Sequence, residues 1–206
     1  SCSDEDRGYF TMHNFDQIIE RSDWADAVII GPGIGTNAET MALAKALIGS
    51  INKPVILDAD GLKCFRELQC DLEKLIVTPH LGEFSTMVEQ TTNEIKSDFV
   101  SIVNRFMSGF NGTALIKQVP ACICHGTQVS LNSSGNPALA TAGTGDVLSG
   151  ILGTFSAQGM NGYDAARLGA YFHGKAGDQL SSSIGKRGMI ASDLPIAVAS
   201  IIKKYE

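Results

Sequence analysis

Residues 26–58 read DAVIIGPGIGTNAETMALAKALIGSINKPVILD, and this stretch decides the fold class. The apolar run that ends at Ile30 predicts a buried strand, and PVILD at 54–58 predicts a second one. Between them, Thr36-Asn-Ala-Glu39 has the pattern of a capping box and opens a predicted helix near 37–49. A strand, a helix and another strand joined in this way favour a parallel sheet.

The same alternation of strands and helices continues along the chain. Further strands are predicted at 74–78 and 113–117, and either a hairpin or two short edge strands at 121–125 and 127–131. Helices are predicted near 61–68, 82–89, 94–109, 145–158, 163–181 and 192–204. The first 20 residues are polar and poorly patterned, which predicts either a frayed start or missing upstream chain. We therefore predict one α/β domain over 1–206, with an open, mostly parallel sheet covered by helices on both faces.

Composition limits the classes of partner. The 206 residues are 44% hydrophobic, enough for a sizeable core, and carry a net charge of −6. This charge argues against a nucleic-acid partner or an anionic membrane surface, both of which need clustered positive charge. No apolar run reaches the length of a membrane span, and no signal peptide is visible, so we expect a cytoplasmic protein.

The five cysteines are odd in number and irregularly spaced, at positions 2, 64, 70, 122 and 124. This favours reduced thiols over a disulfide framework. Cys122 and Cys124 have no matching second ligand pair for a metal. We expect them to be buried as small hydrophobic residues on one face of a strand.

Three turns that follow predicted strands carry polar or glycine-rich motifs, each with two interpretations. Gly31-Pro-Gly-Ile-Gly35 can let a ligand approach the backbone at a helix start, or can be only a tight turn. Asp58 and Asp60 can bind magnesium or a polar substrate group, or can cap the next helix. In Thr78-Pro-His80-Leu-Gly82-Glu83, His80 can bind substrate and Glu83 can hold a metal through water, or both can be structural.

A fourth glycine motif imitates a phosphate-binding loop. Residues 169–176, GAYFHGKA, match most of the P-loop spacing but lack its Ser or Thr and lie inside a helical pattern. We predict that it is not a P-loop, and that His173 and Asp178 are packing and helix-end residues.

The strongest signal is AGTGDVLSG at 142–150. Gly143, Thr144 and Gly145 can aim successive N–H groups at one point where a helix begins, which makes an anion hole. Asp146 then lies in the first helical turn, where it can act as a base that deprotonates an attacking hydroxyl. The alternative is an acid that only complements the helix dipole.

Four motifs occur together and in a recognisable order: GPGIG at 31–35, DADGL at 58–62, TPHLGEF at 78–84, and GNPALATAGTGDVLSGILGTFSAQG at 135–159. As a set they resemble the ADP-dependent NAD(P)H-hydrate dehydratase family of the ribokinase-like superfamily. The resemblance runs from about Asp26 to the C-terminus, with residues 1–25 poorly matched. It implies a ribokinase-like fold from which the N-terminal part is missing, because family members normally begin with a further strand and substrate loop. Such a truncation would leave an exposed sheet edge or an unfilled face.

The resemblance also implies a reaction. Members of the family remove water from hydrated NADH or NADPH, using the terminal phosphoryl group of ADP, with Mg2+ as a further cofactor. Asp146 would activate the ring hydroxyl, and the Gly143–Gly145 loop would stabilise the phosphoryl group. Phosphate then leaves, giving NAD(P)H and AMP. The implied partners are the two nucleotides, an NAD(P)H-hydrate epimerase and further copies of the chain in a homo-oligomer.

The resemblance also implies roles for individual residues, taken from the family positions that their motifs match. Gly35 and His80 match positions that hold the hydrated dinucleotide. Lys117 matches the lysine that opens the adenine-nucleotide segment, and Gly145 also faces that nucleotide. Gln118 and Pro120 depart from the family pattern on this side of the pocket.

Two alternatives fit the same motifs. One is a ribokinase-like kinase that phosphorylates a vitamin-precursor alcohol, since an anion hole and Asp146 would serve either reaction. The other is a nucleotide-binding module without catalytic activity.

Overall fold

The computed structural model describes residue 4 and residues 6–68 and 70–205, which fold around a sheet of strand order β1-β2-β3-β4-β5-β6. β1–β4 pair in parallel, whereas β5 pairs antiparallel with both β4 and β6. The predicted mostly parallel sheet and the predicted hairpin are therefore confirmed. The strands are β1 (Val28–Ile30), β2 (Val55–Leu57), β3 (Leu75–Val77), β4 (Thr113–Ile116), β5 (Ala121–His125) and β6 (Gln128–Asn132).

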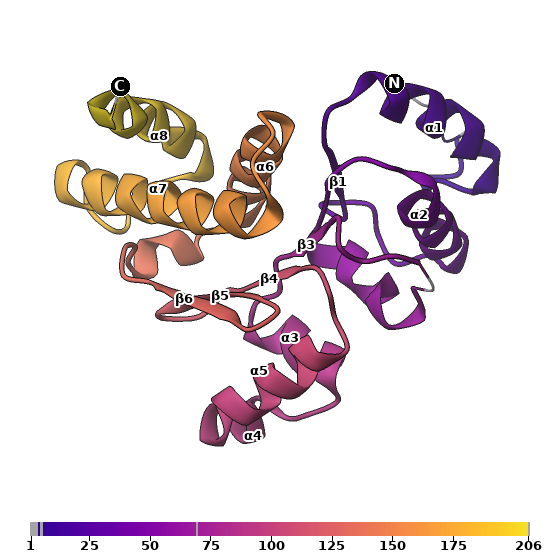
Figure 1. Cartoon of the computed structure of the whole chain (residues 1–206). Helices are drawn as coiled ribbons and strands as arrows, with labels where there is room; N and C mark the ends of the chain where they lie inside the picture. The colour runs from indigo at the N-terminus through magenta and orange to yellow at the C-terminus, as the bar shows by residue number, and fades with distance from the viewer. Residues whose placement is uncertain (1–3, 5, 69, 206) are drawn as a thin grey trace.

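Helices cover both faces of the sheet (Figure 1). One layer holds α1 (Phe15–Trp24), α2 (Ala38–Ser50), α3 (Leu81–Val88), α4 (Thr92–Ser97) and α5 (Phe99–Ser108); the other holds α6 (Thr144–Ala157), α7 (Gly162–Ser183) and α8 (Leu194–Ile202). Short 3-10 helices are η1 (Met12–Asn14), η2 (Ala59–Glu67), η3 (Pro137–Ala140), η4 (Ala191–Asp193) and η5 (Lys203–Tyr205). No helix in the described part of the chain is both long and apolar enough to cross a bilayer.

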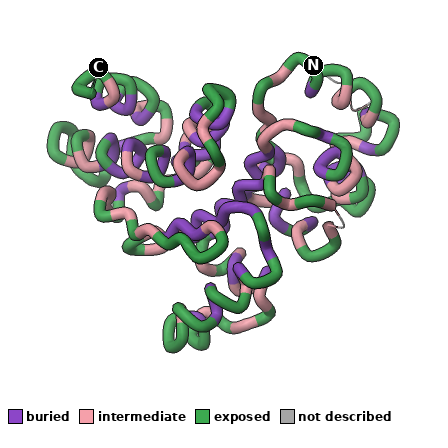
Figure 2. The backbone as a smooth tube through the Cα atoms, in the orientation of Figure 1, coloured by how far each residue is buried: buried purple, intermediate pink, exposed green. Residues whose placement is uncertain are grey.

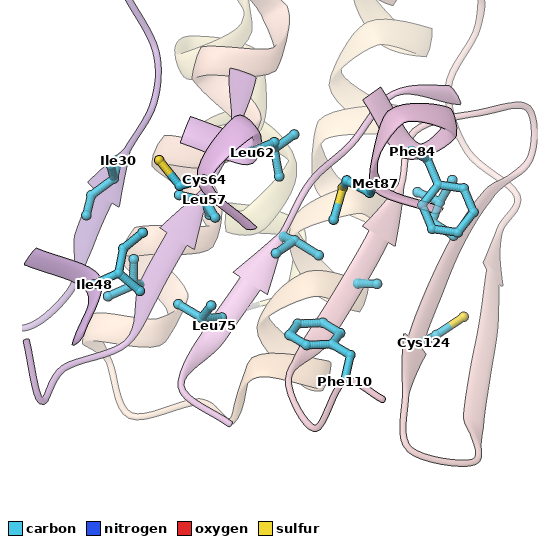
Figure 3. Packing of buried hydrophobic residues seen from close by; sticks show 14 of the residues in the cluster. Ile30, Ile48, Leu57, Leu62, Cys64, Leu75, Phe84, Met87, Phe110 and Cys124 are labelled. Carbon is cyan, nitrogen blue, oxygen red and sulfur yellow. The ribbon is translucent and has the colours of Figure 1, made fainter. Parts of the chain in front are cut away.

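The sheet separates two apolar clusters. Successive side chains of a strand point to opposite faces. Leu57 therefore packs with Phe84 in the α1–α5 layer, while its neighbour Ile56 packs with Leu152 in the α6–α8 layer. Figure 3 shows the first cluster, and Figure 2 shows the central strands buried between the layers. Burial on both faces explains why β2 and β3 read as unbroken apolar runs.

The predicted frayed start is wrong, because α1 lies within the first 25 residues. Phe15, Ile18 and Ile19 share one face of this helix and pack against the α1–α5 cluster. Their spacing is the helical one of three and four residues, which the surrounding polar residues concealed.

Three local predictions are also corrected. The side chain of Asn37, not Thr36, caps α2 by accepting a hydrogen bond from the Glu39 N–H over 2.9 Å. The element predicted near 61–68 is the 3-10 helix η2. The helix predicted at 94–109 is broken at Asp98, whose φ of −139° and ψ of 50° are not helical.

The turn after β1 requires close packing of two backbones. Gly31 has a φ of +132°, and a methyl group built on it would lie 1.7 Å from the carbonyl oxygen of Asp58. Gly61 faces it, since a methyl group there would lie 2.7 Å from the carbonyl oxygen of Ile30. The glycines therefore allow the segments after β1 and β2 to touch, which supports the structural interpretation of the GPGIG motif.

The hairpin sets the direction in which the chain reaches α6. β5 begins beside the carboxyl end of β4, because Cys122 pairs with Ile116. β6 returns to that edge, where Asn132 pairs with Ala121. The loop 133–143 therefore starts at the edge of the sheet where β1–β4 end.

Candidate active site

Four chain segments meet at the carboxyl edge of the sheet. Asp58 directly follows β2, and Lys117 directly follows β4. Lys117 donates its backbone N–H to the carbonyl of Pro79 over 2.7 Å, and it forms a parallel bridge with His80 beyond the end of β3. α6 begins here too, since a methyl group on Gly145 would lie 3.7 Å from Lys117 Nζ and 3.8 Å from Asp58 Oδ2. The motifs therefore meet where ligands of such sheets bind.

The turn that opens α6 differs in one respect from the predicted anion hole. Gly143 has a φ of 84° and a ψ of −11°, a left-handed conformation that favours glycine. Thr144 is buried and donates its hydroxyl to the carbonyls of Leu139 and Thr141, over 2.6 and 2.8 Å. Its N–H also donates to Thr141, over 3.3 Å. Thr144 therefore shapes the turn and does not supply the anion-binding N–H that the sequence suggested.

The donors left for an anion are the N–H groups of Gly143, Gly145 and Asp146, none of which has a backbone acceptor among the described residues. Amides in the first helical turn have no acceptor within their own helix, and the helix dipole adds partial positive charge there. The next amide, of Val147, reaches the carbonyl of Gly143 over 3.2 Å. Of the predicted donors only Thr144 is therefore excluded, and the turn lies at the start of a helix of suitable length.

The Asp146 side chain is available for chemistry. Asp146 is exposed and has no hydrogen bond or ion pair with the described residues. Its backbone lies in the same first turn as the free N–H groups. A carboxylate here can accept a proton from a hydroxyl that approaches an anion held by that turn.

Asp58 forms a buried ion pair at the centre of the edge. Its residue is 2% exposed, its Oδ1 accepts from Lys117 Nζ over 2.7 Å, and its Oδ2 accepts from the Ser149 hydroxyl over 2.8 Å. The cap interpretation of Asp58 is wrong, whereas Asp60 lines a separate cavity between η2 and α3, where binding of a polar substrate group stays a prediction. The Asp58 side chain makes no cap hydrogen bond with η2, and Asp60 lies apart from it, paired with Lys63 over 3.2 Å.

The Asp58 carboxylate is held in its ionised form. Burial by itself raises its pKa, but the charge of Lys117 and hydrogen bonds from Lys117, Thr78 and Ser149 outweigh burial. The pKa of Asp58 therefore lies below its usual value. The cluster carries a full negative charge opposite the Lys117 ammonium at neutral pH.

A cavity of ≈ 520 Å³ opens beside the α6 turn, within the range of about 300–1,000 Å³ that small-molecule sites occupy. Lys117, Thr144 and Gly145 line its end at the sheet edge. Gln118 and Pro120, the residues that depart from the family pattern, form part of its wall. The loop after β6 and α7 complete a lining that is largely apolar.

Helix α7 holds that loop in place. Asp178 accepts hydrogen bonds from the Gly135 N–H over 3.0 Å and from Asn136 Nδ2 over 2.9 Å. A methyl group on Gly174 would lie 2.2 Å from Ser134 Oγ, so glycine is needed where the loop packs on the helix. The P-loop-like stretch does lie within α7, as predicted. Asp178 is not a helix-end residue but fastens the wall of the cavity.

His173 links α7 to the start of α6. It is 7% exposed, and its Nε2 lies 3.0 Å from the carbonyl oxygen of Thr144. Burial lowers the pKa of His173 to about 4, despite the opposing effect of that hydrogen bond. The neutral imidazole donates to Thr144 and fixes the turn, which confirms the packing role.

We expect this histidine to make folding stability depend on pH. Between its ordinary pKa of about 6.5 and its folded value, the unfolded chain binds a proton that the native chain does not, so stability falls as pH falls. The native chain should lose about 2 kcal/mol between about pH 7 and about pH 5 through this group. His173→Gln keeps a donor for Thr144 and should lose correspondingly less; urea denaturation of both chains at the two pH values measures the difference. Equal losses would contradict the buried neutral imidazole.

His80 caps α3 with its side chain. Its Nδ1 accepts from the N–H groups of Gly82 and Glu83 over 3.0 and 3.1 Å, and Glu83 Oε2 accepts from the His80 N–H over 2.7 Å. Glu83 Oε1 lies 3.4 Å from His80 Nε2. Both carboxylate oxygens of Glu83 thus face His80, which argues against the metal ligand that the sequence suggested.

His80 also stands between two cavities. It lines the large one and a second of ≈ 350 Å³ between η2 and α3. With Nδ1 used as an acceptor in the cap, Nε2 is the ring nitrogen that carries a proton and can donate to a ligand. Gly35 lies in an exposed turn with a φ of 74° and lines neither cavity.

The described residues contain no group of three or more His, Cys, Asp or Glu side chains able to hold a metal ion. Cys122 and Cys124 are buried, with their sulfurs 3.4 Å apart, as small hydrophobic residues would be. Cys64 and Cys70 are also free thiols, and Cys2 lies outside the described residues.

Sequence reasoning missed Ser149 and the pairing of Asp58 with Lys117. Both charged residues directly follow predicted buried strands, and charges at neighbouring strand ends are candidates for an ion pair. That signal was in the sequence. The contact between Ser149 and Asp58 joins residues 91 positions apart and has no local signature.

Comparison with known proteins agrees with the geometry. Residues 7–199 match the NAD(P)H-hydrate dehydratase family, so the match begins well before Asp26. The chain is 34% identical to the bifunctional NAD(P)H-hydrate repair enzyme Nnr of Moorella thermoacetica and 35% identical to the ADP-dependent (S)-NAD(P)H-hydrate dehydratase of Neisseria meningitidis. These alignments cover 97% and 87% of this chain, but only 38% and 63% of the relatives.

Solved structures show the same fold. An ADP/ATP-dependent NAD(P)H-hydrate dehydratase from Bacillus subtilis has a TM-score of 0.77 at 23% identity, over 90% of this chain and 71% of that one. A ribokinase-like superfamily protein from Enterococcus faecalis has a TM-score of 0.80 at 26% identity, over 93% of this chain and 68% of that one. Since the family match spans most of the chain, the protein belongs to the NAD(P)H-hydrate dehydratase family.

Proposed function

We propose that this chain carries the active site of an ADP-dependent NAD(P)H-hydrate dehydratase. The observation that supports this most is the α6 turn: an exposed Asp146 carboxylate, unpaired among the described residues, follows Gly145, which lines the large cavity, in a turn with free N–H groups. The two relatives named above are an NAD(P)H-hydrate repair enzyme and a dehydratase that depends on ADP. We expect ADP to bind together with Mg2+, which proteins usually hold through one or two carboxylates and the phosphates of the substrate.

In the proposed reaction, Asp146 takes the proton of the ring hydroxyl as its oxygen attacks the terminal phosphorus of ADP. The bond from that phosphorus to AMP breaks, and the first-turn N–H groups with Lys117 stabilise the charge on the phosphoryl oxygens. The carbon–oxygen bond of the phosphorylated hydrate then breaks, phosphate leaves with the bonding electrons, and the neighbouring ring carbon loses a proton. The products are NAD(P)H, AMP and phosphate.

The two cavities support separate places for the two nucleotides. We assign ADP to the large cavity, which Lys117 and Gly145 line, and the hydrated dinucleotide to the side of His80 and the second cavity. The large cavity reaches the start of α6 at Gly145, and His80 lines both cavities, which supports a meeting of the hydroxyl and the terminal phosphoryl group near Asp146.

The direct test follows NADH recovery from its hydrate in the presence of ADP and magnesium, with product analysis. AMP and phosphate formed in step with NADH support the proposal. A stable phospho-alcohol would instead show a kinase, and ADP binding without turnover would show a non-catalytic module.

Two partner assignments and the cellular location stay proposals. The word bifunctional in the name of the Moorella relative supports an NAD(P)H-hydrate epimerase as the functional partner. A homo-oligomer is the habit of the family. A cytoplasmic location is supported by the free thiols of the described cysteines.

His80→Ala should raise the KM for the hydrated dinucleotide about 2- to 10-fold, with a smaller change in kcat, because one hydrogen bond to bound substrate is lost. It should also destabilise the chain by about 1 kcal/mol through loss of the α3 cap. His80→Asn restores the cap but not the imidazole, so it separates the two effects. ADP affinity measured by calorimetry should barely move; loss of ADP binding with substrate binding kept would reverse the assignment of the cavities.

A further inference from the structure

Three side chains from distant parts of the sequence meet beneath the α6 turn. Asp58 comes from the end of β2, Lys117 from the end of β4 and Ser149 from the second turn of α6. Asp58 Oδ1 faces the Lys117 ammonium over 2.7 Å, and Oδ2 faces the Ser149 hydroxyl over 2.8 Å. Each oxygen therefore has its own partner, and the orientation of the carboxylate is fixed.

Stability alone does not account for this ion pair. Removing two charges from water costs several kcal/mol, and apolar replacements of buried ion pairs are often neutral or stabilising. The surroundings are apolar enough for such a replacement, because Ile56 and Leu115, two residues before Asp58 and Lys117 and on the α6 face of the sheet, are both fully buried. A charged pair at this place is better explained by what the exposed end of the pair can do.

The pair has an inner and an outer end. The Asp58 side chain is 2% exposed and does not line the large cavity, whereas the Lys117 side chain is 24% exposed and does. Asp58 cannot reach a ligand in that cavity except through Lys117. The lysine ammonium in turn lies beside Gly145, whose N–H belongs to the anion-binding turn.

We propose that Asp58 is a positioning residue: it holds the Lys117 ammonium against the first turn of α6, so that ammonium and N–H groups bind the same phosphoryl oxygen. A lysine side chain free to move would lose rotamer freedom on binding, and here that freedom is already removed by the ion pair. The inference rests on the proposed function, which places the terminal phosphoryl group of ADP at this turn.

Comparison of the affinities for ADP and AMP tests this arrangement. AMP lacks the terminal phosphoryl group but makes the same adenosine contacts. Asp58→Asn should weaken ADP binding about 10- to 100-fold, as expected for the loss of a charge-assisted contact, and AMP binding much less. A general structural defect would weaken both nucleotides alike.

A double-mutant cycle tests whether Asp58 acts through Lys117. Lys117→Met should weaken ADP binding at least as much as Asp58→Asn, and adding Asp58→Asn to Lys117→Met should cause little further loss. Calorimetric titration with ADP and AMP measures all four chains. The proposal would be overturned if the fold-losses of ADP affinity in the two single variants multiplied in the double variant. It would also be overturned if each variant lost ADP and AMP affinity equally.

Two further variants keep the test decisive. Ser149→Ala frees one carboxylate oxygen without removing charge, and it can replace Asp58→Asn in the cycle if the latter does not fold. Its expected loss of ADP affinity is several-fold, and this loss should also vanish in the Lys117→Met chain. Asp164→Asn breaks the exposed Asp164–Arg167 ion pair, far from the cavities, and should leave both affinities unchanged.

The outcomes also separate this inference from the proposed function. A native chain that binds ADP but does not dehydrate the hydrate contradicts the dehydratase, while the Asp58 cycle can still support the positioning role. A native chain that binds no ADP overturns both.

Discussion

Asp146→Asn is expected to reduce turnover of hydrated NADH by about 10²–10⁴-fold while the fold stays intact. The amide has the size of the carboxylate but cannot accept the hydroxyl proton. Because Asp146 is exposed and its side chain has no partner among the described residues, loss of its charge should cost the fold only its interaction with the helix dipole, about 0.3–1 kcal/mol. The unfolding midpoint and the ADP affinity should therefore stay close to those of the native chain.

The measurement is the rate of NADH recovery, with ADP binding followed separately by calorimetry. Asp164→Asn is the matched control, since it removes an acid from the first turn of α7 instead of α6. Near-normal turnover of the Asp146 variant would mean that this acid only complements the helix dipole, the alternative interpretation of the motif.

Gly31→Ala is expected to have the largest effect on stability, about 4 kcal/mol or more, or to prevent folding. The added methyl group would lie 1.7 Å from the Asp58 carbonyl oxygen, at a φ of +132° that side chains rarely adopt. Backbone atoms cannot move aside as a flexible side chain can. The segments after β1 and β2 would have to separate, and Asp58 would move with them.

Gly33→Ala provides the control, because Gly33 also has a positive φ, +69°, but nothing lies within 4 Å of the added methyl group. It should lose only the conformational contribution, about 1–2 kcal/mol. Denaturant unfolding of both variants gives the comparison. A Gly31 variant as stable as the Gly33 variant would contradict the close packing of the two turns.

The strands were predictable because burial on both faces leaves a clear mark. β2 and β3 are apolar at every position, and the residues that follow them are turn formers. The start of α6 was predictable for a similar reason, since GTGD combines a residue fit for left-handed backbone with an acid in a first helical turn. Both features depend on residues that are close together in the chain, so the sequence alone indicates them.

The errors concern competition between neighbours or contacts across the fold. Thr36 and Asn37 are both good caps, and only the path of the chain decides between them. Thr144 was expected to point an N–H at an anion, but the carbonyl of Thr141 accepts it instead. Asp58 was weighed as a cap or a metal ligand because its partner Lys117 is 59 positions away.

The number of strands in the hairpin of β5 and β6 determines at which end of the sheet the chain enters α6. β5 carries the chain away from the carboxyl ends of the parallel strands, and β6 carries it back, so an even number of such strands returns the chain to the end from which it left. With one strand fewer, loop 133–143 would emerge beside Gly126, and the anion-binding turn would form at the wrong end of the molecule. Changes of length at the distal turn are therefore tolerable, whereas deletion of a single strand would separate Asp146 from Asp58, His80 and Lys117.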